Sequence, residues 1–358
     1  MTAALPMPVE QLSRVEQARA EMLTALVDEL NRSGLPYCLL SGFHAFPMAA
    51  VSDMDFMVRP CDSGRVVALL QRAARRCDAL LVQAMQHETE AWYFVLAKQV
   101  ESEVAYLHPD CSTDYRRAGR LWLKAEEVLA RRRQYRTFYV PAVADEFLYY
   151  LVKKVLKREI TAEQLRRLRA LYLSSPEECC AQMRRFWPGA RVRKVVAAIL
   201  ESDVWKVRWH LPGLREELLA SEPVEGWQAR AAQQVRECRR WAERVMHPTG
   251  LSIAICGGSR QQRDVMANGL ERNLRPAFRR TRSLDEGGLG PAMWQWVSQV
   301  RSTLLLHQVA SSWASTFARH QIRFELSETP PDVESATRAA LAWMEERLER
   351  QMNHAAPE

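Results

Sequence analysis

The chain has 358 residues, of which 47% are hydrophobic and 26% charged, a composition typical of globular proteins with two or three domains. No window of 18 apolar residues occurs, which excludes a membrane-spanning helix at the sequence level, and the first ten residues lack the basic start and apolar core of a signal peptide. The net charge of +7 permits an anionic partner such as a nucleotide, a nucleic acid or an anionic glycan.

The cysteine pattern indicates the cellular compartment, and the arginine pattern bears on whether the positive charge marks an anionic partner. None of the eight cysteines forms a CxxC pair or lies at zinc spacing from a histidine, so we expect a reducing, cytoplasmic location. Much of the positive charge lies in arginine runs, which we interpret mainly as solvated helix faces. The runs are Arg72 to Arg76, Arg131 to Arg133, Arg166 to Arg169 and Arg279 to Arg282.

The first 124 residues predict a small α/β domain with a sheet of mixed strand direction. Apolar periodicity and turn residues give the following order. A helix spans 9–33, strands span 37–40 and 54–58, a helix spans 63–77, and strands span 92–97 and 103–108.

Residues 125–247 read as a helical region, and residues 248–358 as a small Rossmann-like or P-loop-like α/β domain with a parallel sheet. The helices of the middle region are expected at 125–133, 142–158, 162–173, 176–186, 191–201 and 226–246. The last region begins with a strand at 251–256, followed by a helix to residue 270, strands at 302–306 and 322–326, and a helix at 332–350. No flexible linker separates the regions, so we expect them to pack as one unit, with tryptophans 205, 209, 227 and 241 between them.

Two aspartates in the stretch "SDMDFMV" carry the chemistry of the first region. Asp53 and Asp55 alternate along a strand, so their carboxylates project from one face and repel each other. Divalent magnesium, which prefers hard oxygen ligands, relieves such repulsion. Asp110, after the strand 103–108, is our candidate for a third carboxylate, and the turn at Ser41-Gly42 offers backbone amides to a triphosphate.

With Gly42 upstream and Asp110 downstream, this pattern resembles the signature of the nucleotidyltransferase fold, the DNA polymerase β-like superfamily. The resemblance implies magnesium-dependent transfer of a nucleotidyl group from a nucleoside triphosphate. Asp53 and Asp55 would then be metal ligands, and Asp110 a further ligand or the base that deprotonates the acceptor. The family has Gly-Ser or Gly-Gly where this chain has Ser41-Gly42.

The stretches "DCSTDYRRAGRLWLKAEEVL" and "ADEFLYYLVKKVLKREI" are similar to nucleotidyltransferase-like proteins encoded with bacterial surface or exopolysaccharide genes. The resemblance covers about residues 20 to 160 and implies a role in surface-polysaccharide biosynthesis. Four basic residues in these stretches are candidates to face nucleotide phosphates, namely Arg116, Arg117, Lys153 and Lys154.

The stretch "LSIAICGGSRQQRDVMANGL" has the strand, loop and helix order of a P-loop, GxxxxGK[ST]. With Gly257 and Gly258 opening the loop, Gln262 takes the place of the second glycine, Arg263 that of lysine and Asp264 that of the hydroxyl residue. The region therefore resembles a thymidylate-kinase-like domain whose phosphate site has been lost, a pseudokinase. We expect no productive ATP binding there.

Three functions remain open. The leading one is a magnesium-dependent nucleotidyltransferase that acts on a hydroxyl acceptor, a sugar, a sugar phosphate or a protein side chain. The second is an inactive pseudoenzyme that binds a nucleotide or a polysaccharide-synthesis partner and regulates it. The third is a nucleic-acid-directed transferase, against which the dispersed arginines argue.

Overall fold

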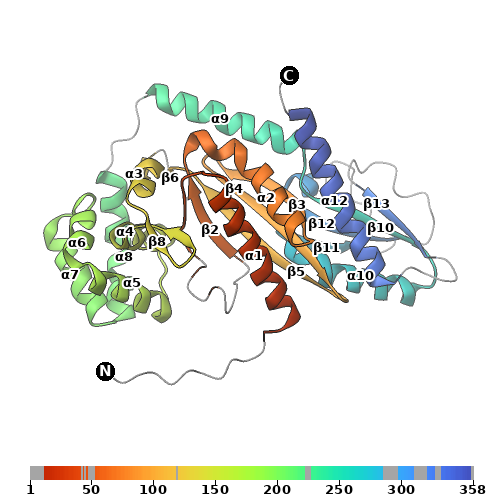
Figure 1. Ribbon diagram of the computed structural model, residues 1–358, viewed down its shortest axis with the longest axis horizontal. Coiled ribbons are helices and arrows are strands. Elements are labelled where there is room, and N and C mark those ends of the chain that lie inside the picture. Colours follow the sequence, from red (N-terminus) through yellow and green to blue (C-terminus); the bar gives the residue numbers. More distant parts are fainter. Residues whose placement is uncertain are drawn as a thin grey trace.

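The computed structural model describes residues 12–41, 43, 46, 53–117, 120–221, 227–284, 297–309, 321–326 and 332–355. Figure 1 shows a central sheet from the first part of the chain, a group of helices on one side of it, and a second sheet with its own helices on the other side. The chain is therefore a mixed α/β protein. Within the described residues, no helix is both long and apolar enough to cross a bilayer.

The first region is a five-stranded sheet in the order β1-β2-β5-β4-β3, in which β2 and β5 are parallel and the other neighbours are antiparallel. Its elements are α1 (Arg14–Arg32), β1 (Tyr37–Leu39), β2 (Asp53–Val58), η1 (Pro60–Arg65), α2 (Val66–Arg76), β3 (Leu80–Glu88), β4 (Ala91–Val100) and β5 (Glu103–Ser112). A capping box between Ser13 and Glu16 starts α1. The apolar faces of α1 and α2 cover one face of this sheet, where Phe56, Phe94 and Leu107 are fully buried.

Two short hairpins and a helical group follow. They comprise β6 (Tyr115–Arg117), β7 (Arg120–Leu123), α3 (Ala125–Ala130), β8 (Arg133–Tyr135), β9 (Phe138–Val140), α4 (Val143–Lys157), α5 (Ala162–Ser174), α6 (Pro176–Arg184), α7 (Gly189–Leu200), α8 (Val204–Ser221) and α9 (Trp227–Met246). Helices α3 to α8 share a core that also includes Cys38 and Met57 of the sheet, which fixes α4 beside β2. Phe138 and Val140 pack instead in the core of the first region, so the region boundary at residue 124 stays a prediction.

The last region contains a four-stranded parallel sheet in the order β11-β12-β10-β13. Its elements are β10 (Leu251–Gly257), α10 (Arg260–Leu274), η2 (Arg275–Ala277), β11 (Arg280–Leu284), β12 (Thr303–Val309), β13 (Gln321–Leu326) and α12 (Val333–Ala355). The parallel direction agrees with the strand–helix alternation of the sequence, because parallel neighbours need crossover connections.

The second face of the five-stranded sheet contacts the helical group at Met57, contacts the last region on β3, β4 and β5, and otherwise carries an open site. Val82, Val95 and Tyr106 on this face are buried in one core with α10, α12 and the four-stranded sheet. The Tyr106 hydroxyl donates to the Asn273 carbonyl (2.7 Å), and the Asn273 side chain donates to the Ser102 carbonyl (3.1 Å). Apolar burial thus joins the two sheets, while the acidic end of this face stays uncovered.

Trp205, Trp209 and Trp241 make no comparable contribution, which corrects the sequence expectation for these three residues. Trp205 and Trp209 on α8 are 80% and 84% exposed, and Trp241 is 50% exposed beside the Arg240 and Arg244 guanidinium groups. The Trp227 side chain lies outside the described residues. The contact between the two sheets is formed instead by a mixed core in which Val82, Val95 and Tyr106 meet side chains of the last region.

Several arginines of the runs pair with buried carboxylates instead of covering solvated faces. Arg72 and Arg76 bind the buried Glu29 at 3.0 and 2.7 Å. The buried pair Asp145 and Glu146 at the start of α4 is likewise bound by Arg131, Arg133 and Arg167 at 2.8 to 3.2 Å. Since a buried carboxylate needs a partner, these arginines serve the fold, and a continuous nucleic-acid groove does not follow from the runs.

Candidate functional site

The two predicted aspartate positions meet across the parallel strand pair. Asp55 of β2 lies in register with Asp110 of β5, and Asp53 lies in register with His108. Residues in register on neighbouring strands project from the same face. Asp53, Asp55 and Asp110 therefore share the uncovered end of the second sheet face, as their spacing in the sequence suggests.

Asp55 already has two partners. Its Oδ2 atom accepts hydrogen bonds from Ser41 Oγ (2.5 Å) and from Lys153 Nζ (2.7 Å). Lys153 is presented by α4, which packs beside β2, and its Nζ also lies 3.4 Å from the Tyr149 hydroxyl. The Asp55 side chain is 19% exposed, so this ammonium group provides the local counter-charge.

Asp110 lacks such compensation. Burial and the neighbouring Asp55 carboxylate raise the pKa of Asp110 to about 7, although Lys153 acts in the opposite direction. The Asp110 Oδ2 atom lies 3.8 Å from Nε2 of His87 on β3. A carboxyl group that titrates near neutral pH can take up or release a proton during a reaction.

Asp53 is the most accessible of the three, with a side chain that is 86% exposed. Its Oδ1 atom lies 3.3 Å from Nδ1 of His108. The His108 ring is stacked between Tyr93 and Tyr106, and its Nε2 atom lies 3.1 Å from the Pro276 carbonyl of the last region. The last region thus fixes the imidazole ring that faces Asp53.

A cavity of about 470 Å³ opens above these groups, and we call it the carboxylate cavity. β2, β3, β4, β5, β6 and α4 contribute to its walls. Its polar lining combines carboxylates with a few cations and phenols, namely Asp53, Asp55, His87, Glu88, Glu90, Tyr93, His108, Asp110, Ser112, Asp114, Tyr115, Arg116, Tyr149, Lys153 and Lys157. The acidic side chains outnumber the lysines and arginine, so an anionic ligand would need an added cation.

The donor set suits magnesium, since it consists of carboxylate oxygens on adjacent strands. Burial, and then the charge of Asp55, raises the pKa of Asp110, and a bound cation would act in the opposite direction. As the side chains stand, no three His, Cys, Asp or Glu groups within the described ranges are gathered to hold a metal ion. Lys153 holds one oxygen of Asp55, and His108 lies against Asp53. A metal held here would need these two carboxylates to turn toward Asp110.

Other predicted phosphate-binding residues are only partly gathered. Ser41 contacts Asp55, and Arg116 and Lys153 line the carboxylate cavity. Lys154 does not line it, because its ammonium group lies over the Tyr150 ring at 5.0 Å on another side of α4. Consecutive helical residues point about 100° apart, so the two lysines could not both face the cavity. Gly42 and the Arg117 side chain lie outside the described residues.

The loop after β10 is fixed by contacts within the last region, and the loss of its phosphate site stays a prediction. Gly257 has φ +74°, and a Cβ atom there would lie 2.8 Å from the Leu326 carbonyl oxygen, which explains the glycine. Ser259 caps α10 in a capping box with Gln262. Arg263 is 7% exposed and donates from Nη1 to the carbonyls of Gly257 (3.2 Å) and Gly258 (2.9 Å).

Arg263→Ala should therefore lower stability and leave nucleotide affinity unchanged. The substitution removes charge-assisted bonds to two loop carbonyls, worth about 1–3 kcal/mol. Arg260→Ala, at an exposed position of the same helix, is the matched control and should unfold like the parent. Denaturant unfolding and ATP titration measure the two effects, and a clear loss of ATP affinity in Arg263→Ala would contradict our interpretation of the loop.

Sequence reasoning missed His87, Glu88, Tyr93 and His108. The β3 residues were missed because β-bulges after Leu81 and Gln86 break the alternation that marks a strand. Strand alternation could have found Tyr93 and His108. Each lies an even number of residues from another side chain on the same face of its own strand, β4 or β5, and therefore projects from that face as well.

No family model matches the chain, and no curated protein is significantly similar to it. Among solved structures, one match is described as "Crystal structure of putative nucleotidyltransferase from H. pylori", with 12% identity, 59% of this chain covered, 100% of that chain covered and a TM-score of 0.29. A TM-score this low carries no argument, so the interpretation of the site rests on its own geometry.

The Asp110 carboxyl predicts how stability depends on pH. Its pKa of about 7 in the fold exceeds the ordinary value of 3.8, so the folded chain binds the extra proton and stability falls as pH rises from about 4 to 7. If Asp110 were fully buried, the free energy of unfolding would fall by about 4 kcal/mol over this pH range. We expect a loss of about 1–2 kcal/mol, because the side chain is 34% exposed and solvent screens its charge.

Asp110→Asn should therefore be more stable than the parent at pH 8 and closely similar at pH 4. Urea unfolding without metal at both pH values tests this. Asp28→Asn, at a 46% exposed position on α1, is the control and should follow the parent at both values. Equal stability of Asp110→Asn and the parent at pH 8 would show that the folded state does not disfavour the ionised Asp110 carboxylate.

Proposed function

We propose that the carboxylate cavity binds a nucleoside triphosphate with magnesium and transfers its nucleotidyl group to a hydroxyl acceptor. The observation that carries this proposal is the register of β2 and β5, which sets Asp55 opposite Asp110 with Asp53 two residues away on the same face. The resemblance of the Asp-x-Asp segment to nucleotidyltransferases points to the same chemistry.

Each group has a role that its surroundings support. Asp53 and Asp55 are the proposed metal ligands, and Asp110 is a further ligand or the base, favoured by its pKa of about 7. Lys153, now paired with Asp55, would move to the triphosphate when a metal replaces it at that carboxylate. Bound magnesium would supply charge for the phosphates and for the departing pyrophosphate.

The reaction balances without any further reagent. The acceptor oxygen forms a bond to the α-phosphorus, while the bond between that phosphorus and the α–β bridging oxygen breaks and pyrophosphate leaves. Asp110 accepts the hydroxyl proton. In-line attack needs little covalent chemistry from the protein, so positioning and charge carry most of the catalysis.

Titration of the four nucleoside triphosphates with and without magnesium tests the proposal. One triphosphate at 100 times its dissociation constant should add about 2.7 kcal/mol of stability, and only when magnesium is present. Pyrophosphate release in the presence of a hydroxyl acceptor would then identify transfer. Absence of magnesium-dependent binding for all four would contradict the proposal.

The ion pair between Asp55 and Lys153 favours a second candidate, a catalytically inactive protein that binds a nucleotide and regulates a partner. With Lys153 already neutralising Asp55, that carboxylate has a counter-charge without a metal. This candidate predicts triphosphate binding that is equal with and without magnesium, and no pyrophosphate release. A link of either activity to surface-polysaccharide synthesis stays a prediction.

A further inference from the structure

A second, smaller cavity of about 180 Å³ adjoins the carboxylate cavity under helix α9, and we call it the α9 cavity. His87, Glu88, Glu90 and Arg116 border both cavities, whereas the residues of α9 line only the smaller one. A ligand in the α9 cavity would therefore lie directly beside the proposed transfer site.

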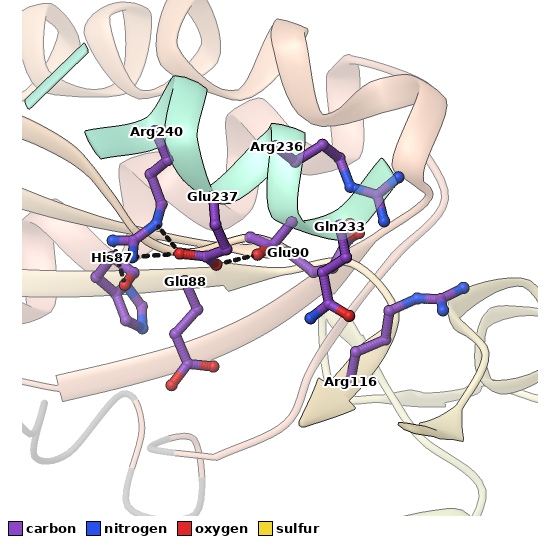
Figure 2. Close-up of a pocket in the computed structure, with 9 residues that line it drawn as sticks. His87, Glu88, Glu90, Arg116, Gln233, Arg236, Glu237 and Arg240 are labelled. Atoms are coloured by element: carbon purple, nitrogen blue, oxygen red, sulfur yellow. Dashed lines mark hydrogen bonds and ion pairs between the residues drawn. The ribbon is translucent and has the colours of Figure 1, made fainter. Parts of the chain in front are cut away.

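One wall of the α9 cavity is rigid and already paired. Arg240 donates to Glu237 at 2.6 and 3.1 Å and to the His87 carbonyl at 3.0 Å, and Glu237 also accepts from the Thr89 hydroxyl. These bonds fasten α9 to the turn between β3 and β4 (Figure 2). The charges of Arg240 and Glu237 offset each other, so this pair shapes the cavity and leaves recognition to its neighbours.

The rest of the lining carries both cationic and carboxylate side chains. Figure 2 shows Arg236, Gln233 and Arg116 along one side, while Glu88 points away from them. Arg236 is exposed and, among the described residues, has no carboxylate partner within ion-pair distance. Glu88 is also exposed and without such a partner in the same ranges. Such a pocket offers a cation to an anionic group and carboxylate oxygens to hydroxyls.

The surroundings favour an anion at the arginine side. Arg236, Arg240 and Arg244 recur every four residues on α9, so they lie along one side of the helix. Burial, together with the charges of Arg279 and Arg240, lowers the pKa of Arg244. Within the lining itself, Glu237 offsets Arg240 and Asp114 pairs with Arg116, so Arg236 is the cation that would attract an anionic ligand.

We propose that the α9 cavity is the acceptor subsite and takes a small phosphorylated polyol. Its phosphate lies against Arg236, and its hydroxyls lie against Glu88 and Glu90, with one directed toward Asp110. The name acceptor subsite rests on the proposed function. Binding of the phosphorylated polyol itself requires neither nucleotide nor magnesium. Arginine suits a phosphate because its planar donors match two phosphate oxygens.

Calorimetric titration of the full chain tests the binding, without nucleotide or metal. The probes are glucose 6-phosphate, glycerol 3-phosphate, glucose and inorganic phosphate. We expect at least one phosphorylated polyol to bind about 10-fold more tightly than both glucose and inorganic phosphate. Arg236→Ala should weaken that binding about 10-fold, as loss of one charge-assisted contact implies.

Arg239→Ala is the matched control, because Arg239 lies on α9 outside the cavity with a 79% exposed side chain paired to Glu243. It should bind like the parent. Glu88→Gln should reduce the advantage of the phosphorylated polyol over inorganic phosphate. If no phosphorylated polyol binds, if inorganic phosphate binds equally well, or if Arg236→Ala changes nothing, the proposal is wrong. Tighter, Arg236-dependent binding of a single-stranded oligonucleotide would replace it with a nucleic-acid acceptor.

Failure of this inference and of the proposed function can be told apart. Arg236-dependent binding of a phosphorylated polyol without any magnesium-dependent triphosphate binding would keep the subsite and contradict the transferase. Conversely, nucleotidyl transfer to an unphosphorylated acceptor at the same rate in Arg236→Ala would keep the transferase and overturn the subsite.

Discussion

Replacing Asp53 and Asp55 together by asparagine should abolish magnesium-dependent triphosphate binding. Loss of outer partners of a metal site costs about 10–100-fold in affinity, so loss of two direct ligands should exceed 100-fold. The stability of the metal-free fold should change little, because two effects oppose each other. The ion pair between Asp55 and Lys153 is lost, but so is the repulsion by which the Asp55 carboxylate helps to raise the pKa of Asp110. Calorimetry with and without magnesium, and urea unfolding, measure the two effects.

The matched control is Asp28→Asn with Asp78→Asn, which removes two exposed carboxylates of the same region. That variant should bind the magnesium–nucleotide complex like the parent. If the Asp53 and Asp55 double variant also binds as the parent does, the proposed metal site is wrong. If it binds triphosphate equally with and without magnesium, the inactive nucleotide-binding protein is favoured instead.

Truncation after Met246 should sharply lower solubility and thermal stability. It removes the last region and exposes Val82, Val95, Ala97 and Tyr106, each no more than 2% exposed in the full chain. Large apolar side chains contribute about 1.5–3 kcal/mol each when buried, so several kcal/mol of interface burial disappear. Thermal unfolding and size-exclusion chromatography of residues 1–246 measure the result.

A full-length Val265→Ser variant is the control for surface changes in the last region, since Val265 is 60% exposed on α10. It should keep the parental melting temperature. A truncated chain that stays soluble, monomeric and as thermally stable as the full chain would refute an obligate contact between the two sheets.

The sequence predicts that the three carboxylates lie on one sheet face, because strand alternation is a local rule, whereas their role as metal ligands stays a prediction. Asp53 and Asp55 share a face through a separation of two residues, and Asp110 needs only a parallel neighbour. Helices with strong apolar periodicity or caps, such as α1 and α5, are also readily predicted. Helix α8 was missed because Pro212 lies inside it, and proline normally ends a helix.

What could not be predicted depends on contacts between distant segments. Nothing in the local sequence distinguishes Lys153 from Lys154, yet the packing of α4 beside β2 directs only Lys153 to Asp55. Arg236 likewise lies in an ordinary charged helix pattern until α9 is placed over the turn between β3 and β4. The exposed Trp205 shows the converse, because residue type alone wrongly suggested burial.

The contact between His108 and Pro276 also sets an order of events during synthesis. Its two residues are 168 positions apart, so the ribosome must add that many residues before the imidazole ring gains its carbonyl partner. At about 5–20 residues per second, this takes roughly 10–30 s. Throughout that interval the nascent sheet displays Tyr106 and Val95 without their cover. The last region must therefore be made before this apolar face is covered and before the His108 ring beside Asp53 gains its carbonyl partner.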